Sequence, residues 1–204
     1  ALAKMRDDGF TKVAVQSLHV IAGAEYNDLQ DTVQTFRRQP FGFDSITLGK
    51  PLLASYEDVE KVCKAMLAQI PEERQDEDAV IFMGHGTHHP AGLAYTAVES
   101  ILNQLDNRAY MGTVEGQPSL EKVLKKCRAA DIRKAWLMPF MSVAGDHARN
   151  DMAGDSEDSW QSILEKNGIE SESVLKGMGE YDSVVQVWLN HLSEALNELH
   201  HTDD

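Results

Sequence analysis

The feature that most constrains the fold is a regular alternation of short apolar runs with longer segments of helical periodicity. The runs rich in apolar and β-branched residues lie at 13–18, 45–48, 79–83, 109–114 and 135–138, with a weaker one at 172–175. Helical patterns are found at 25–38, 56–69, 91–105, 118–130, 148–167 and 183–200. This alternation predicts an α/β fold in which parallel strands have helices on both faces. The run 79–83 is almost wholly apolar, which is typical of a strand buried on both faces.

The chain of 204 residues is long enough for one large domain or two small ones. The charged stretch 71–78, between a predicted helix and the central strand, is the best candidate for a domain junction. We therefore predict an N-terminal α/β half over 1–75 and a C-terminal α/β half over 76–182. The apolar stripe of the helix at 183–200 is expected to face a core, which the N-terminal half can supply.

Composition excludes several classes of function. The formal net charge of −14 argues against a nucleic-acid partner and against docking on anionic lipid. No apolar run approaches the roughly 20 residues of a membrane span. Cys63 and Cys127 lie far apart inside helical patterns and are predicted to be small buried side chains. The chain opens on a helical pattern and does not begin with an initiator Met, so we expect sequence upstream. A cytoplasmic location is predicted and a periplasmic one stays open.

Three predicted strands are each followed by a residue type that binds metals. His85 follows the run 79–83, Glu115 follows the run 109–114, and His147 follows the run 135–138 after a loop. Ligands of open parallel sheets bind beyond the carboxyl ends of the strands, so these side chains are expected at one edge. Two imidazoles and a carboxylate suit a divalent first-row metal. Three protein ligands would leave coordination positions open for a metal that is handed on.

The neighbours of these candidates leave alternatives open. Asp146 could orient His147 or cap the helix that follows. His19, which follows the first strand, is either a second wall of the pocket or a hydrogen-bonded residue of a turn. A phosphate loop, a dinucleotide-binding glycine motif and a nucleophile elbow are all missing from the sequence, and no organic cofactor is predicted. The remaining candidates, predicted to be structural, are His88, His89 and His191.

Several segments together resemble one known family. They are residues 15–26, 47–53, 80–86 and 112–115, and above all Leu-Met-Pro-Phe-Met-Ser-Val-Ala-Gly-Asp-His at 137–147, which continues to 152 and is followed by Asp-Ser-Trp at 158–160. Over essentially its whole length the chain is similar to the single-chain sirohydrochlorin cobalt chelatases of the anaerobic cobalamin pathway. These chelatases are related to ferrochelatases.

The resemblance implies two similar α/β halves with a tetrapyrrole in the cleft between them, and a metal on His85, Glu115 and His147. It implies insertion of Co²⁺ into sirohydrochlorin, with Fe²⁺ or Ni²⁺ as alternative metals, and a homo-oligomer. The family begins with a strand and a helix that would precede Ala1, so the N-terminal half is expected to be incomplete. The residues expected to contact the substrate are Ser17, His19, Gly84, Gly86, Thr87, Val143, Ala144, Gly145 and Arg149.

For the reaction we predict that His85 and Glu115 anchor the metal and that His147 accepts protons, because a neutral imidazole does either. The glycines beside the two histidines would let a flat ring approach the backbone. The acidic protein should repel a polycarboxylate substrate, so helix N-termini and Arg149 are expected to bind it locally. The alternatives are an iron or nickel chelatase, a non-catalytic metal or tetrapyrrole carrier, and a metallohydrolase using further carboxylates.

Overall fold

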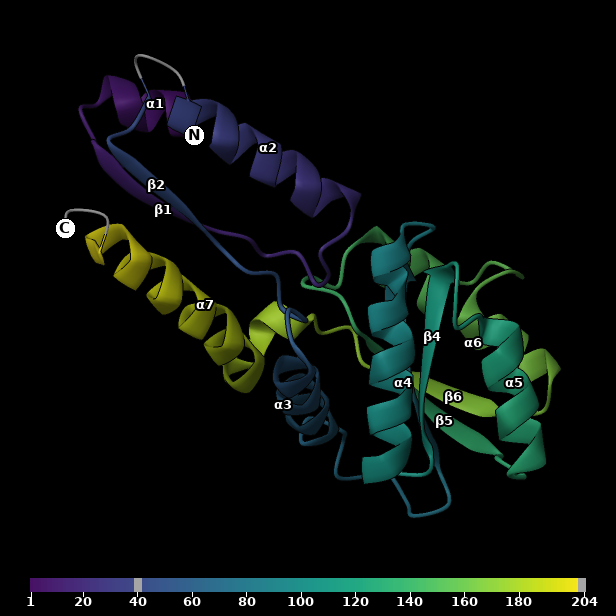
Figure 1. The fold of residues 1–204 in the computed structure, drawn as a ribbon. Helices are drawn as coiled ribbons and strands as arrows, with labels where there is room; N and C mark the ends of the chain where they lie inside the picture. Colours follow the sequence, from purple (N-terminus) through teal and green to yellow (C-terminus); the bar gives the residue numbers. More distant parts are fainter. Residues whose placement is uncertain (39–41, 202–204) are drawn as a thin grey trace.

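The computed structural model describes residues 1–38 and 42–201, and the strands in this part of the chain form two parallel sheets (Figure 1). The smaller sheet pairs β1 (Lys12–Gln16) with β2 (Ser45–Gly49). The larger sheet has the order β4-β3-β5-β6, formed by β3 (Ala79–Gly86), β4 (Ala109–Glu115), β5 (Lys134–Pro139) and β6 (Glu170–Ser173). The predicted α/β class with parallel strands is confirmed.

Helices cover both faces of the smaller sheet. On one side α2 (Ala24–Arg38) packs on β2, and on the other α7 (Asp182–His201) packs on both strands (Figure 1). Neighbouring side chains of β2 point to opposite faces of the sheet. Ile46 belongs to the same apolar cluster as Val33 of α2, whereas the Thr47 hydroxyl donates to the Ala195 carbonyl of α7 at 2.8 Å. The short α1 (Leu2–Asp7) precedes β1. None of the described helices is long and apolar enough to cross a membrane.

The larger sheet is also covered on both faces. One face packs against α3 (Tyr56–Leu67), α4 (Leu93–Leu105) and α7, and the other against α5 (Leu120–Ala129) and α6 (Trp160–Lys166). Strand β3 contributes to both cores, because Val80 and Phe82 join the first cluster while Ile81 and Met83 join the second. All four side chains are fully buried, which accounts for the continuous apolar run in the sequence.

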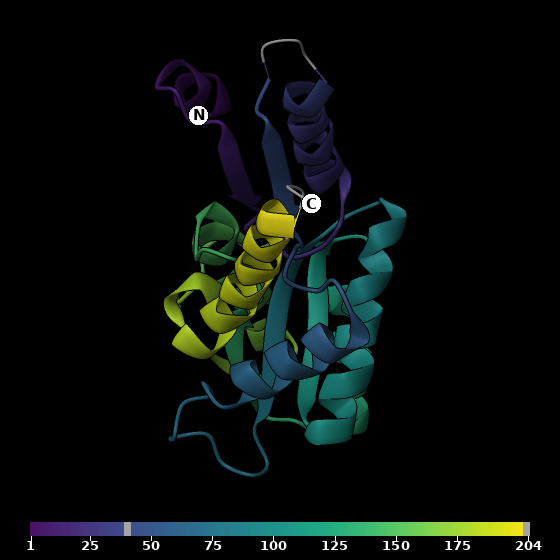
Figure 2. The ribbon, with the colours of Figure 1, turned by 60° about the vertical axis from the view of Figure 1, so that its left-hand side comes forward.

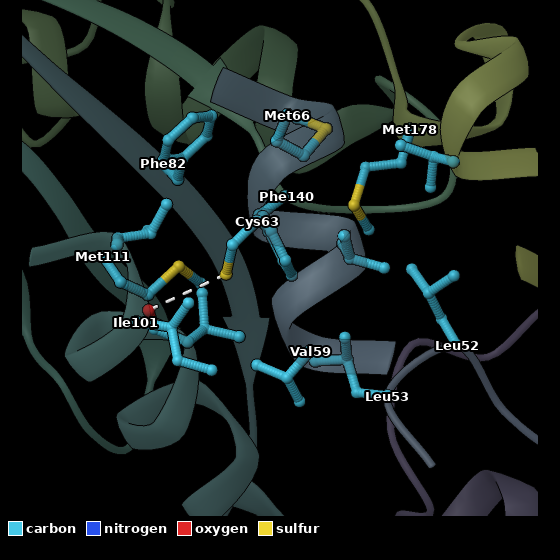
Figure 3. Close-up of a cluster of buried hydrophobic side chains, with 14 of the residues drawn as sticks. Leu52, Leu53, Val59, Cys63, Met66, Phe82, Ile101, Met111, Phe140 and Met178 are labelled. Atoms are coloured by element: carbon cyan, nitrogen blue, oxygen red, sulfur yellow. Dashed lines mark hydrogen bonds between the residues drawn. The ribbon is translucent and has the colours of Figure 1, made fainter. Parts of the chain in front are cut away.

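Helix α3 lies within residues 1–75 but packs on elements of the larger sheet. Its buried Val59, Cys63 and Met66 lie among side chains of the larger sheet and α4, including Phe82 (Figure 3). The Cys63 thiol donates to the Val98 carbonyl with a sulfur–oxygen distance of 3.9 Å, and burial raises its pKa to about 12. We call the smaller sheet with its helices the smaller unit, and the larger sheet with its helices the larger unit. The two units are joined by a shared apolar core as well as by the chain.

The smaller unit lies beyond the carboxyl ends of the larger sheet's strands (Figure 2). Residues 18–21, in the segment after β1, therefore face the loops that follow β3 and β5. This juxtaposition forms the site described below.

The single helix predicted over 148–167 is wrong. The structure has a π-helical turn, η2 (His147–Met152), then irregular backbone, then α6 from Trp160. A Cβ atom at Gly154 would lie 2.4 Å from the Asn150 carbonyl oxygen, so only glycine fits the turn that ends η2. Ser159 then caps α6 by accepting from the Ser162 amide at 3.1 Å. The weak last strand is also shifted, from 172–175 to 170–173.

Candidate active site

A cavity of about 440 Å³ lies where the end of β1 faces the ends of β3 and β5. Its volume is in the range of small-molecule sites in proteins, about 300–1,000 Å³. The segment after β1 and the start of α2 form one wall, and the loops after β3 and β5 form the other. The lining residues are Leu18, His19, Val20, Ile21, Glu25, His85, Gly86, Thr87, Tyr95, Met141, Ser142, Val143, Gly145, Asp146 and His147.

His85 and His147 lie against each other in this cavity. Their ring centroids are 4.8 Å apart and the ring planes meet at 85°. His85 is the exposed residue near the end of β3, and His147 begins η2 with 40% of its side chain exposed. Two of the three predicted metal ligands, which are 62 positions apart in the sequence, are thus in contact range.

Both imidazoles use Nδ1 for a hydrogen bond to an oxygen. His85 Nδ1 lies 3.0 Å from the Gly86 carbonyl oxygen, and His147 Nδ1 lies 2.5 Å from Oδ2 of Asp151. Carbonyl and carboxylate oxygens only accept, so both Nδ1 atoms carry the proton. In a neutral imidazole the lone pair is then on Nε2. The cavity is therefore lined by two imidazoles whose Nε2 atoms remain available to bind a metal or accept a proton.

Glu115 is placed differently from the two histidines. It ends β4 and pairs in register with Gly86 of β3, but its side chain is exposed and does not line the cavity. Among residues 1–38 and 42–201, no three His, Cys, Asp or Glu side chains are grouped closely enough to hold a metal ion. The structure brings the third predicted ligand to the neighbouring strand end without bringing its carboxylate to the histidines.

A family model described as cobalt chelatase (CbiK) matches residues 1–197. The chain belongs to the CbiK cobalt chelatase family. The curated relatives include sirohydrochlorin cobaltochelatase CbiKC of Nitratidesulfovibrio vulgaris strain Hildenborough, 44% identical over 199 residues that cover 98% of this chain and 70% of the relative. Sirohydrochlorin cobaltochelatase of Salmonella typhimurium strain LT2 is 40% identical over 197 residues, 97% of this chain and 73% of the relative.

Two solved structures have the same fold as this CbiK-family chain. SirB from Bacillus subtilis with Fe³⁺ has a TM-score of 0.63 and 19% identity, covering 96% of this chain and 76% of SirB. The sirohydrochlorin chelatase SirB from Bacillus subtilis subspecies spizizenii, in complex with cobalt, has a TM-score of 0.57 and 19% identity, covering 94% of this chain and 72% of that one. At this identity the likeness shows a common fold.

The residues expected to contact the substrate divide into two groups. Those lining the cavity of this CbiK-family chain are His19, Gly86, Thr87, Val143 and Gly145. Those outside the lining are Ser17, Gly84, Ala144 and Arg149. Ser17 supports a residue of the first group, because its hydroxyl accepts from the His19 amide at 3.1 Å. Two members of the second group bind each other: Arg149 Nε donates to the Ala144 carbonyl at 3.2 Å.

The glycines around His85 are required by packing. A Cβ atom at Gly84 would lie 2.5 Å from Met111 Cε, inside the core. Gly86 has a φ of +79°, and a Cβ atom there would lie 1.8 Å from the Glu115 carbonyl oxygen. Gly145 is the more open of the three, since its Cβ would meet nothing closer than Val143 Cγ2 at 3.8 Å. Approach of a flat ring to the backbone stays a prediction, and Gly145 is the glycine of the three that leaves room beside its Cα.

The cavity loop after β5 is braced from behind by the segment between β6 and α7. The amides of Met178 and Gly179 donate to the carbonyls of Met141 and Ser142 at 2.8 and 2.9 Å. A Cβ atom at Gly177 would lie 2.6 Å from the Cα of Val143, so glycine is needed for this contact. The Ser142 hydroxyl also donates to the carbonyl of Leu18 on the opposite wall at 2.7 Å. These bonds fix the loop that ends at His147.

Sequence reasoning missed several cavity residues. Glu25, in the first turn of α2, brings a carboxylate to the cavity wall, and its place directly after the His19 segment was an available signal. Tyr95 of α4 also lines the cavity; burial raises the pKa of its hydroxyl above the ordinary value, and a backbone hydrogen bond with Gly86 offsets this only in part. The contact between Asp151 and His147 was not predicted either, although their spacing of four residues could have indicated it.

The other polar candidates have structural partners. Asp146 forms no capping bond and accepts instead from the Asn150 side chain at 2.7 Å, and Asp151 rather than Asp146 contacts the His147 ring. His89 Nδ1 accepts from the Ala91 amide at 3.1 Å at the start of a 3₁₀ turn, η1 (Pro90–Gly92). His191 is buried in α7 with Nε2 3.4 Å from Asp58 Oδ2 of α3.

Proposed function

We propose that this chain is an enzyme that inserts Co²⁺ into sirohydrochlorin and releases the two pyrrole N–H protons. The observation that carries the proposal is the pair of imidazoles in a cavity of a CbiK-family chain, each with Nδ1 bonded to an oxygen. The names of both curated relatives state the same reaction for those proteins. The paired Nε2 atoms supply what the reaction needs, which is a ligand for the incoming metal and an acceptor for the outgoing protons.

In the proposed mechanism His85 holds the metal substrate through Nε2, with Glu115 as the second anchor. The Glu115 side chain is exposed at the end of β4, so a change of rotamer toward His85 disrupts no core packing. His147 accepts a pyrrole proton at Nε2 and passes it to solvent, to which its side chain is 40% exposed. Repeating this step removes the second proton as the metal leaves His85 for the macrocycle.

The Glu25 carboxylate lines the same cavity from the opposite wall. A negative charge there favours a divalent cation or a transient imidazolium, because opposite charges attract strongly where water is partly excluded. The walls that would contact the macrocycle faces are largely apolar and include Leu18 and Val143, which are 63% and 70% exposed. Apolar walls with a few polar groups are typical of small-molecule sites.

The test is cobalt insertion followed by the absorbance change of the macrocycle. Wild-type protein should form more metallated product than there is protein, since a non-catalytic carrier would stop at one equivalent. His147→Ala should lower turnover about 100-fold or more, since a positioned general base contributes about 100- to 10,000-fold. His88→Ala is the matched control, because His88 is exposed and lies outside the cavity lining.

Parallel assays with Fe²⁺ and Ni²⁺ decide the metal, since imidazole binds all three ions. A higher kcat/KM with Fe²⁺ or Ni²⁺ than with Co²⁺ would replace cobalt in the proposal. Undiminished turnover in His147→Ala would remove His147 from the mechanism.

We further infer a homo-oligomer, on the general frequency of symmetric assemblies among soluble enzymes. Light scattering measures the assembly directly. A cytoplasmic location is inferred as well, and fractionation of the producing cells distinguishes it from a periplasmic one.

A further inference from the structure

We propose that Asp151 is a positioning residue, whose carboxylate holds His147 in the tautomer that leaves Nε2 free to act. This inference rests on the proposed function for its consequence, but the tautomer itself can be measured without turnover. The direct support is the 2.5 Å contact between Asp151 Oδ2 and His147 Nδ1. A carboxylate bonded to the second ring nitrogen fixes both the orientation and the tautomer of a functional histidine.

The local backbone explains why Asp151 and not Asp146 has this role. His147 and Asp151 are four positions apart in the π-helical turn η2, where the Ala153 amide donates to the Ala148 carbonyl at 3.3 Å. Such a turn is rare in proteins and is frequent at functional sites. The Asp146 carboxylate is engaged by the Asn150 side chain.

The two histidines differ in what fixes their tautomers. His85 Nδ1 is bonded to a backbone carbonyl, that of Gly86, which remains when a side chain is replaced. His147 depends on a side chain, the Asp151 carboxylate. Substitution of Asp151 should therefore change the tautomer of His147 and leave that of His85 as it is. This difference supplies an internal control within one molecule.

The first experiment measures the tautomers by ¹⁵N NMR of histidine-labelled protein, at a pH where the imidazoles are neutral. Signals of the two rings are assigned from His85→Ala and His147→Ala. In wild-type protein both rings should carry the proton on Nδ1. In Asp151→Ala the His147 signals should move toward the Nε2–H form while those of His85 stay. Asp155→Ala is the matched control. Asp155 is exposed and lies three residues after the end of η2, and its substitution removes the same charge.

The second experiment measures cobalt insertion by Asp151→Asn and Asp151→Ala. Asparagine keeps the shape of aspartate, but its amide can donate to Nδ1 and so stabilise the unwanted tautomer. If Asp151 acts through the tautomer, both variants should lose about 10- to 100-fold in kcat, with KM for the tetrapyrrole little changed. A merely structural role would predict that asparagine restores activity and alanine does not.

The outcomes separate the two proposals. If the wild-type protein forms no cobalt product, the proposed function is wrong. The NMR experiment would still show whether Asp151 sets the tautomer of His147. A His147 ring that keeps its proton on Nδ1 in Asp151→Ala, or an Asp151→Asn variant with full activity, would overturn the positioning role and leave the chelatase proposal intact.

Discussion

Gly86 lies where β3 and β4 end side by side, and its replacement by alanine should destabilise the fold at the edge that carries the site. Its φ of +79° is a conformation that alanine disfavours, and the added Cβ would lie 1.8 Å from the Glu115 carbonyl oxygen. Relief of that overlap requires the two strand ends to move apart by about 1 Å. The movement would displace His85 relative to Glu115.

The magnitude follows from two contributions that a control variant can separate. The left-handed conformation costs alanine about 1–2 kcal/mol, from which about 0.4–1 kcal/mol is recovered by the stiffer unfolded chain. Overpacking against the neighbouring strand adds about 1–3 kcal/mol. We therefore expect Gly86→Ala to lower the free energy of unfolding by about 3 kcal/mol. Gly168→Ala should lower it by about 1 kcal/mol or less, because Gly168 has a φ of +73° but nothing within 4 Å of its Cβ position.

Urea unfolding followed by circular dichroism measures both variants against wild type. In a thermal scan the expected losses correspond to about 6–12 °C for Gly86→Ala and about 2–4 °C for Gly168→Ala, at 2–4 °C per kcal/mol for a chain of this size. Cobalt insertion should fall in the first variant and stay in the second. Equal losses of stability in the two variants would refute the reasoning, because the close contact with β4 would then contribute nothing.

Three further predictions concern the cavity loop, the pH dependence and the charge. Gly177→Ala, whose Cβ would lie 2.6 Å from the Val143 Cα, should raise KM for the tetrapyrrole in steady-state assays by displacing the cavity loop. Burial raises the pKa of Asp106, but hydrogen bonds from Arg74 and the Arg108 amide outweigh it and the net pKa is lowered. Ionised Asp106 therefore stabilises the fold above about pH 4, and this contribution is lost as pH falls through the lowered pKa. In Asp106→Asn the free energy of unfolding should therefore depend less on pH in this acid range than it does in the wild type. With a net charge of −14, association with the polycarboxylate substrate in stopped flow should speed up as salt is raised, and a rate that falls would contradict long-range repulsion.

The pattern of the sequence was sufficient for the elements and for part of the site. The apolar run 79–83 predicted a strand buried on both faces, because a strand between two helical layers has no polar face to show. The histidines after two strands were predicted to meet because parallel strands bring their carboxyl ends to one edge. Both features depend on periodicity and on the direction of the chain, which are local properties.

Other features depended on distances between atoms, within a turn or between strands, rather than on the order of apolar and polar residues. The helix predicted over 148–167 is interrupted because the backbone at Gly154 approaches Asn150, a contact that hydrophobic periodicity does not record. Glu115 was expected beside the histidines, but the exposed carboxylate at the end of β4 does not line the cavity. Which of the side chains near one sheet edge reach the cavity depends on their rotamers and on the backbone turns, and both follow from packing.

The sequence by itself determined the α/β class, the buried central strand and the arrival of His85 and His147 at the same edge of a sheet. Only the tertiary structure decided that a wall from the smaller unit faces them, and that this wall contributes Glu25 and His19. Only the structure showed that the His147 ring is hydrogen-bonded to the Asp151 carboxylate. The physical reason is that a strand or helix is specified by contacts within a few residues. A site between two sheets is specified by how their cores pack, and here α7 packs on both strands of the smaller sheet and also contributes to the apolar cluster that contains α3 and β3.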